Sequence, residues 1–214
     1  MKKLAFIGAG SHSDAVFYMQ DRKNYKFVGY FDDKDQNEYN GYPILGTIEE
    51  VVVALDKGLV DNVFITIGDN IKRSEIFDLI KRNHYNKLIN IVAPTATILN
   101  MNSLIGKGIF VGHNCFIGAE VVIKDNVIIN TNSTIEHHTI IENHVNTTIG
   151  ACIAGIVNIG EGVYLGASTT IIQCIEIAPW IKTGAGTVIV NDLDIENGLY
   201  VGLPARYIKK ANQS

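Results

Sequence analysis

Residues 105–129 read IGKGIF-VGHNCF-IGAEVV-IKDNVI-I, so every group of six begins with an aliphatic residue. The spacing runs from Leu99 to Ile177, and thirteen of its fourteen positions hold Ile, Leu or Val, with Thr147 as the exception. Neither the 3.6-residue period of an α-helix nor the two-residue alternation of a strand produces it. A six-residue period predicts a parallel β-helix, in which each buried side chain stacks on the one above. The repeat positions are Leu99, Ile105, Val111, Ile117, Ile123, Ile129, Ile135, Ile141, Thr147, Ile153, Ile159, Leu165, Ile171 and Ile177.

The repeat also predicts which residues meet. Three hexads make one triangular coil, so residues eighteen apart are expected on the same face, about 4.8 Å from each other. The fourth residue after each repeat position is usually β-branched or small, and we expect it to point inward as well. Glycine often follows the repeat position, as at Gly112 and Gly160, where we expect a turning backbone with positive φ. Because the frame does not break, no long inserted loop is expected between residues 99 and 177.

The composition argues against several classes of protein. The 214 residues carry 18 basic and 22 acidic side chains and a net charge of −4, which disfavours nucleic-acid binding through a basic surface. Three scattered cysteines argue against a disulfide framework or a zinc site. The apolar run before Gly8 is too short for a signal peptide, and no run is long enough for a membrane span. We expect a soluble, cytoplasmic protein with no membrane partner and no metal.

Residues 1–94 read as a small α/β domain of the Rossmann-like kind. Strands are expected at residues 3–8, 27–33, 61–68 and 87–93, and helices at about 11–20, 48–55 and 71–83, the last capped by Asn70. Strands that alternate with helices indicate a parallel sheet. The β-helix is expected over residues 95–198. A tail at residues 199–214 is expected to pack near its end, because a β-helix needs its terminal coil covered.

A parallel sheet predicts a ligand site beyond the carboxyl ends of its strands. There the sequence places Gly10, which follows the first strand, and Asp32 and Asp33, which follow the second. Glycines before a helix form an anion cradle, but Ser13 stands where the dinucleotide fingerprint needs its third glycine. The two carboxylates suit hydrogen bonds from a ribose or a base, and a solvated turn is an equal alternative.

Three histidines lie close together in the repeat: His137, His138 and His144. Eighteen residues after His137 is Gly155, which puts an imidazole beside a backbone with no side chain. A histidine base next to an open N–H suits acyl transfer from a thioester, since the N–H stabilises the oxyanion. Polar surface residues are the plainer alternative. A metal site is disfavoured because His138 and His144, six residues apart, fall on adjacent faces of the triangle.

Several motifs together carry a family resemblance: GAGSH (8–12), YFDD (30–33), TIGDN (66–70), NTNSTIEHH (130–138) and VGLPAR (201–206). In this combination the chain resembles, over its whole length, the sugar O-/N-acyltransferases of the left-handed β-helix superfamily. The branch is that of the bacillosamine-pathway nucleotide-4-amino-sugar N-acetyltransferases and the sialic acid O-acetyltransferases. The resemblance implies a homotrimer with acetyl-CoA between adjacent helices and a nucleotide sugar on the N-terminal domain.

The resemblance also implies roles for individual residues. His137 would be the catalytic base and Gly155 the N–H donor to the acetyl carbonyl. The cofactor would contact Gly155 and lie near Ala167, Ala185 and Asn146. The nucleotide sugar, with a UDP, dTDP or GDP carrier, would contact Gly10, Ser11, His12, Asp32, Asp33, Gly68, Asp69 and Asn70, with Arg73 as a weaker candidate for its phosphates.

Two departures from the family pattern bear on the reaction. The family usually has Asp or Glu after the base, where this chain has His138, and a second histidine nine residues after it, where this chain has Asn146. Glu136 would supply a carboxylate only if it turns toward the site. An amine tolerates a weak base better than a hydroxyl does, so N-acetylation of a nucleotide-linked 4-amino-4,6-dideoxysugar is favoured. The alternatives are O-acetylation of a sialic-acid-like sugar, a non-catalytic nucleotide-sugar-binding trimer, and a zinc-dependent γ-type carbonic anhydrase.

Overall fold

The computed structural model describes residues 1–210 and divides the chain into two compact units, Met1–Ile91 and Val92–Ser214. In the first unit, a sheet runs in the order β3-β4-β2-β1-β5. Its strands are β1 (Lys2–Ile7), β2 (Tyr25–Phe31), β3 (Glu38–Tyr39), β4 (Tyr42–Gly46) and β5 (Asn62–Ile65). All neighbours are parallel except β3 and β4. The predicted parallel-sheet domain is therefore confirmed.

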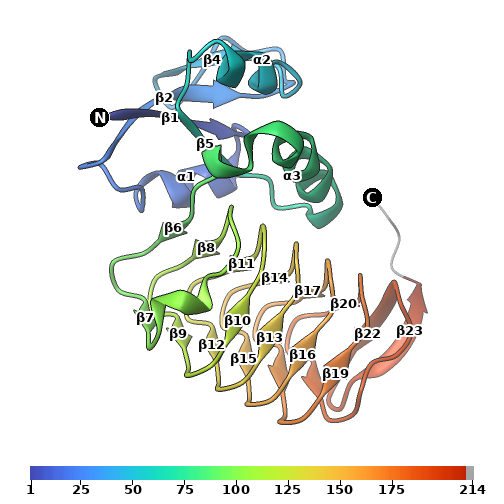
Figure 1. Cartoon of the computed structure of the whole chain (residues 1–214). Coiled ribbons are helices and arrows are strands. Elements are labelled where there is room, and N and C mark those ends of the chain that lie inside the picture. Colours follow the sequence, from blue (N-terminus) through green and yellow to red (C-terminus); the bar gives the residue numbers. More distant parts are fainter. Residues whose placement is uncertain (211–214) are drawn as a thin grey trace. The chain divides into compact units, whose positions relative to one another are not determined.

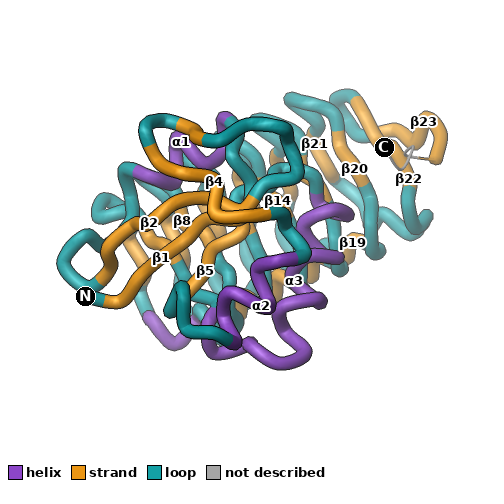
Figure 2. The backbone as a smooth tube through the Cα atoms, turned by 90° about the horizontal axis from the view of Figure 1, so that it is seen from above, coloured by secondary structure: helices purple, strands orange, loops and turns teal. Residues whose placement is uncertain are grey.

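Helices cover both faces of this sheet. α1 (Ser11–Phe17) lies on one face, and α2 (Glu50–Asp56) and α3 (Asn70–His84) lie on the other, as Figure 2 shows from above. Alternate residues of β1 divide between the two layers, because side chains alternate along a strand. Ala5 and Ile7 belong to the aliphatic core beneath α2 and α3, whereas Phe6 packs against the rings of Phe27 and Tyr30.

Three local predictions for this unit are wrong. Residues 87–93 do not form a strand of the sheet: Tyr85–Lys87 is a 3₁₀ turn, η1, and Leu88 makes only one bridge, to Val63. The fourth parallel strand of the sheet is instead β4, which pairs with β2. α1 ends at Phe17 and not near Gln20. The cap of α3 is Asp69, whose side chain accepts a hydrogen bond from the Lys72 N–H, and not Asn70.

The second unit is a parallel β-helix of two-residue strands (Figure 1). Three sheets run along it, and partners are eighteen residues apart, as in the column Ile117, Ile135, Ile153 and Ile171. The predicted coil is confirmed. The strands are β6 (Ile91–Val92), β7 (Thr97–Ile98), β8 (Phe110–Val111), β9 (Phe116–Ile117), β10 (Val122–Ile123), β11 (Ile128–Ile129), β12 (Thr134–Ile135), β13 (Ile140–Ile141), β14 (Asn146–Thr147), β15 (Cys152–Ile153), β16 (Asn158–Ile159), β17 (Tyr164–Leu165), β18 (Thr170–Ile171), β19 (Glu176–Ile177), β20 (Lys182–Thr183) and β21 (Val188–Ile189).

The interior of the coil follows the sequence pattern with one slip. From Val111 onward the repeat positions are buried, and so is the fourth residue after each of them. Thr147 is buried too, with its hydroxyl 3.4 Å from that of Ser133. Leu99 and Ile105, however, are 59% and 58% exposed. In their part of the chain the inward residues are Ile98 and Leu104, because the first coil contains an extra residue between Leu104 and Val111. The 3₁₀ turn η2 (Met101–Ser103) lies between the two inward residues.

The glycines of the repeat have a different role from the one predicted. Positive φ occurs at the third residue after the repeat position, for example at Asn114 (φ 57°) and His138 (φ 58°). The glycines directly after the repeat position are required by close approach: a β-carbon at Gly160 would lie 2.6 Å from the Ile177 carbonyl oxygen. The next coil passes too near for any side chain there.

The C-terminal end of the coil is covered by a hairpin. β22 (Gly198–Val201) pairs in parallel with β20 and antiparallel with β23 (Arg206–Lys210). The pairing gives the backbone of β20 a neighbour and covers that end of the stack, as expected for the tail. Residues 211–214 of the predicted tail lie outside the described residues.

Candidate active site

His137 lies on the coil corner between β12 and β13, two residues after the buried Ile135, and its side chain is exposed. One coil further, Gly155 occupies the same position. A β-carbon built on Gly155 would lie 2.6 Å from Cε1 and 2.7 Å from Nε2 of His137. The imidazole therefore fills the space that any other side chain at residue 155 would need, which is the contact predicted from the eighteen-residue repeat.

The backbone beside this ring offers a hydrogen-bond donor. The Ala154 N–H donates to the Ile171 carbonyl at 3.0 Å on the next coil, and the Ile156 N–H donates to the His137 carbonyl at 2.9 Å on the preceding one. Within residues 1–210, the N–H between them, that of Gly155, has no acceptor. An imidazole and an unused N–H thus lie together, and this is the pair that general-base catalysis with oxyanion stabilisation needs.

The ring of His137 is held by its neighbour in sequence. The Nδ1 atoms of His137 and His138 are 3.1 Å apart, and the two ring planes are nearly perpendicular, at 84°. The Glu136 carboxylate makes no hydrogen bond or ion pair among the described residues, so it does not supply the partner that a turn toward the site would have given. Of the two residues that flank His137, the one whose side chain contacts its ring is His138.

The predicted cofactor residues lie on other parts of the coil. Ala167 and Ala185 stack on the corner that precedes β18 and β21, and the Gly186 N–H donates to the Ala167 carbonyl at 2.7 Å. Asn146 is buried in β14, on a third sheet. Within one chain these residues and the corner of His137 and Gly155 therefore occupy different sides of the triangle.

His144, the third histidine of the cluster, packs inside a different corner. It is buried, its Nδ1 lies 2.8 Å from Nδ2 of Asn126, and its ring stacks on Trp180 at 6.5 Å. Trp180 reaches it across Gly162, where a β-carbon would collide with the indole. Trp180 was missed in the sequence, although its eighteen-residue spacing from Gly162 places it there. Among the described residues, no group of three or more His, Cys, Asp or Glu could hold a metal ion.

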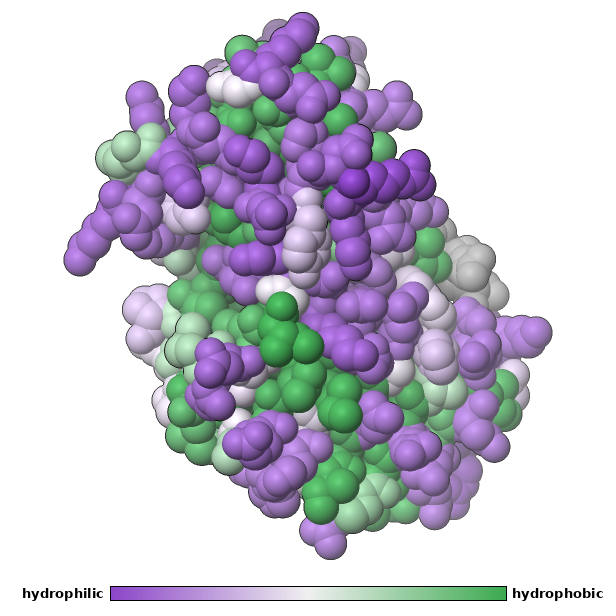
Figure 3. Space-filling model, in the orientation of Figure 1, coloured by the Kyte–Doolittle hydropathy of each residue, from purple (hydrophilic) through white to green (hydrophobic). Residues whose placement is uncertain are grey.

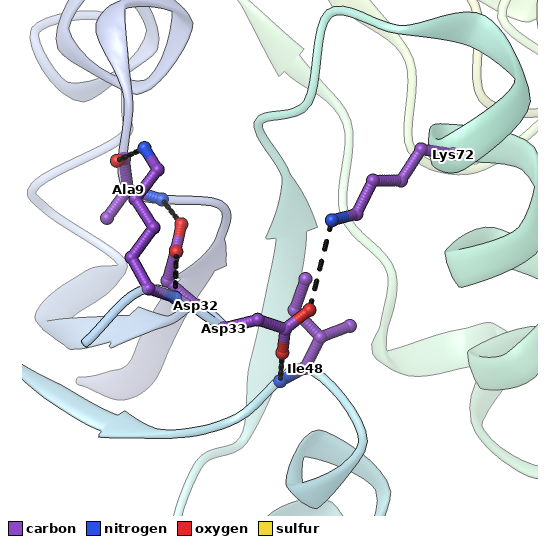
Figure 4. Close-up of polar contacts among 6 residues, drawn as sticks. Ala9, Asp32, Asp33, Ile48 and Lys72 are labelled. Carbon is purple, nitrogen blue, oxygen red and sulfur yellow. Dashed lines mark hydrogen bonds and ion pairs between the residues drawn. The ribbon is translucent and has the colours of Figure 1, made fainter. Parts of the chain in front are cut away.

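A second set of predicted residues lines a hollow of about 290 Å³ in the N-terminal unit, at the carboxyl ends of β1 and β2. Gly10, Asp32 and Asp33 come together there, and Figure 4 shows the two carboxylates. Asp32 organises the loop, since one of its oxygens accepts from the Ala9 N–H at 2.6 Å and the other from the Lys34 N–H at 2.9 Å. Asp33 uses one oxygen for the Ile48 N–H, at 2.9 Å.

Two lysines at this hollow were not anticipated. Lys72 Nζ lies 3.8 Å from the second carboxylate oxygen of Asp33 (Figure 4). Lys34 Nζ donates to the Ala9 carbonyl at 3.1 Å. Thr66 and Ile67, at the end of β5, complete the lining. The sequence contains a signal for both lysines, because Lys34 follows the paired carboxylates and Lys72 lies in the first turn of α3.

The remaining predicted residues surround this hollow without lining it. Ser11 is exposed at the start of α1, and the turn from Gly68 to Asn70 leads into α3. Arg73 is buried, and its guanidinium donates to the carbonyls of Ile67 and Gly68 at 3.3 and 3.2 Å. Burial lowers the pKa of Arg73, although the charge of Asp69 opposes the shift. Arg73 therefore braces the turn and does not face the hollow.

We expect His12 to make the free energy of unfolding depend on pH. Burial, with a smaller contribution from the charge of Arg73, lowers the pKa of His12 to about 4. The folded protein resists protonation there while the unfolded chain accepts a proton, so stability falls as the pH drops from about 6.5 toward 4. In urea titrations, wild type should lose up to about 3 kcal/mol more than His12→Asn between pH 7 and pH 4. Equal losses in both proteins would contradict this assignment.

An imidazole beside an N–H that has no acceptor within residues 1–210, on one corner of a hexapeptide coil, is what the resemblance to the left-handed β-helix acyltransferases predicts. Residues 3–80 match the family model described as the PglD N-terminal domain. No curated protein sequence matches the chain significantly. Among the helices that the structure describes, none is long and apolar enough to cross a membrane.

Solved structures resemble the whole chain. The acetyltransferase domain of PglB from Neisseria gonorrhoeae FA1090 is 28% identical, with a TM-score of 0.83, over 97% of this chain and 100% of that one. The same domain in complex with acetyl coenzyme A is 28% identical, with a TM-score of 0.84, over 97% and 99% of the two chains. A mutant of perosamine N-acetyltransferase from Caulobacter crescentus, in complex with CoA and GDP-perosamine, shares the fold at 23% identity, with a TM-score of 0.76 over 96% of each chain.

By its similarity to these domains over nearly its whole length, the chain is an enzyme of the acetyltransferase class. The family resemblance and the fold class predicted from the sequence are confirmed.

Proposed function

We propose that this enzyme transfers the acetyl group of acetyl-CoA to the 4-amino group of a nucleotide-linked 4-amino-4,6-dideoxysugar, for bacterial glycan or O-antigen synthesis in the cytoplasm. The observation that carries the proposal is the imidazole of His137 against Gly155, beside an N–H that has no acceptor within residues 1–210. The lone pair of the amine attacks the thioester carbon directly, and the oxyanion accepts from the Gly155 N–H. His137 Nε2 removes a proton from the nitrogen, the C–S bond breaks, and the sulfur leaves as CoA.

Acetyl-CoA is supported as the donor by the similar domain that has been solved with it. In this proposal the pantetheine arm lies near Ala167 and Ala185, which are on a different corner from His137. A second copy of the chain would bring such a corner up to the base, so the proposal includes a homotrimer. Exposed isoleucines are available for contact between copies, with Ile149 56% and Ile156 55% exposed. Figure 3 shows apolar side chains at the surface among polar ones.

The nucleotide sugar is assigned to the hollow of the N-terminal unit. One oxygen of Asp33 remains beside Lys72 and suits an N–H of a base or a ribose hydroxyl. Lys72 and Lys34 supply two positive charges for the diphosphate. From the sequence, Arg73 was the candidate for this contact.

Lys72→Gln is expected to raise the KM for the nucleotide sugar about tenfold, because a charge-assisted contact is worth about 1.5 kcal/mol. The kcat should change little, because Lys72 is proposed to contact the nucleotide carrier and not the amine that reacts. Steady-state kinetics with varied nucleotide sugar measure both constants. Lys57→Gln, an exposed lysine at the end of α2, is the matched control and should behave as wild type. An unchanged KM in Lys72→Gln would remove Lys72 from the site.

The function is tested by the release of free CoA from acetyl-CoA with UDP-, dTDP- and GDP-linked 4-amino-4,6-dideoxysugars. Strong turnover on one carrier, with an acetamide product seen by NMR, is the expected result. Turnover only on sugars that carry a hydroxyl in place of the amine would show O-acetylation instead. Calorimetric binding of a nucleotide sugar without CoA release would indicate a non-catalytic binding protein.

A further inference from the structure

The side chain of His138 contacts the ring of His137, the proposed catalytic base. Its Nδ1 lies 3.1 Å from Nδ1 of His137, and within residues 1–210 neither ring has an ion pair. A hydrogen bond between two Nδ1 atoms requires a proton on one and a lone pair on the other. The direction of this bond decides which nitrogen of His137 is basic.

The two directions have opposite chemical consequences. If His138 donates, neutral His137 carries its proton on Nε2, the nitrogen toward Gly155, and has no lone pair there for the amine proton. If His137 donates from Nδ1, its Nε2 lone pair faces the space beside Gly155. Only the second arrangement gives a base at the place where the N–H donor lies.

We propose that His138 is a positioning residue that accepts the Nδ1–H of His137 and so fixes the basic tautomer and the ring orientation of the catalytic imidazole. The inference rests on the proposed function. During the reaction the amine proton moves to Nε2 of His137 and then to the CoA sulfur, while the Nδ1–H remains donated to His138. An uncharged imidazole thus takes the place at which the family uses a carboxylate.

The coil holds the backbone of His138 in a fixed conformation. Its backbone has φ 58°, and its N–H donates to the Ala119 carbonyl at 3.0 Å. Beyond the contact with His137, His138 borders a hollow of about 290 Å³ lined by Ile140, Ile156 and Cys174 among others. The charged groups on neighbouring elements are Glu136, Glu120 on the preceding coil and Glu176 in the hollow, and none of them is bonded to either imidazole.

The test compares three substitutions of His138 in the full chain. His138→Gly suits the positive φ and should lower kcat about ten- to a hundredfold at unchanged KM, the scale for losing the partner that orients a functional imidazole. Added imidazole should restore part of this loss, because it can occupy the vacated space. His138→Glu keeps an acceptor and should stay within a few-fold of wild type. His138→Ala, which also lacks an acceptor, replaces the Gly variant if that one does not fold.

Asn132→Gly is the matched control. Asn132 has φ 60°, and its N–H donates to the His113 carbonyl at 2.9 Å, so the backbone is the same, but Asn132 lies on a different corner from the proposed base His137. It should keep wild-type kcat. A His138→Gly enzyme with wild-type kcat, or an equal loss in Asn132→Gly, would overturn the proposal.

A readout independent of activity separates this inference from the proposed function. The ¹⁵N chemical shifts of the His137 ring should show the neutral proton on Nδ1 in wild type and a shift toward Nε2–H in His138→Gly. A wild-type ring already protonated on Nε2 would overturn the role of His138 whatever the substrate is. Absence of CoA release in wild type, with the expected shifts, would overturn the proposed function alone.

Discussion

His137→Asn should lower kcat for CoA release by about a hundredfold or more, the scale of a lost general base. Asn fills a similar volume and forms hydrogen bonds, but it cannot take the proton that the amine must lose. The KM values for both substrates should change little, because the side chain acts on the transition state. Initial rates at saturating acetyl-CoA and acceptor, measured on purified wild type and variant, provide the comparison.

His113→Asn is the control for this substitution. His113 occupies the same position in its hexad, two residues after Val111, but it lies on a different corner from His137. Its Nδ1 is 2.8 Å from the Thr95 hydroxyl. It should retain wild-type kcat. If His137→Asn turned over at the wild-type rate, the base would lie elsewhere, and the contact between His137 and Gly155 would be only structural.

The coil was predictable because the six-residue period of aliphatic residues follows directly from which side chains are buried inside it. A residue pointing into a narrow triangular core can only be small or aliphatic, so six-residue spacing and eighteen-residue stacking follow from the sequence. The same pattern failed at Leu99 and Ile105, because an extra residue follows Leu104 and the inward positions before it are Ile98 and Leu104. A hydrophobic residue one place out of register looks the same in the sequence.

The α/β unit was less predictable because short strands carry little signal. The KLINIVA segment has the composition of a strand, yet it leaves the sheet after one bridge. β4 is five residues long and contains Pro43 and Gly46, which favour a loop in a sequence pattern. Tertiary pairing with β2 outweighs that preference.

In the candidate site, the contacts that depend on the backbone alone were predictable, and those that depend on side-chain torsions were not. The repeat placed His137 beside Gly155, because that contact depends only on which residues are one coil apart. It gave no information on the bond to His138, since a side-chain torsion decides it. Lys34 and Lys72 were missed for a related reason: their contribution depends on where two loops meet, and Arg73 was the more conspicuous cation in the sequence.

Gly155→Ala should abolish most activity and leave the fold intact. The added β-carbon would lie 2.6 Å from Cε1, 2.7 Å from Nε2 and 3.0 Å from Nδ1 of His137. All three atoms belong to an exposed side chain that can swing outward, so the cost to folding is small. The imidazole, however, must leave its place beside the Gly155 N–H and its contact with His138. We expect kcat to fall about a hundredfold, with a melting temperature close to that of wild type.

A double-mutant cycle identifies the route of this loss. If the methyl group acts by displacing His137, then adding Gly155→Ala to His137→Asn should cost almost nothing further, because the displaced group is already absent. Independent effects would instead multiply and lower kcat about ten-thousandfold in the double variant. That result would mean that the added methyl group disturbs the N–H donor or the bound thioester itself. A non-additive cycle would tie the base to Gly155 in the functioning enzyme.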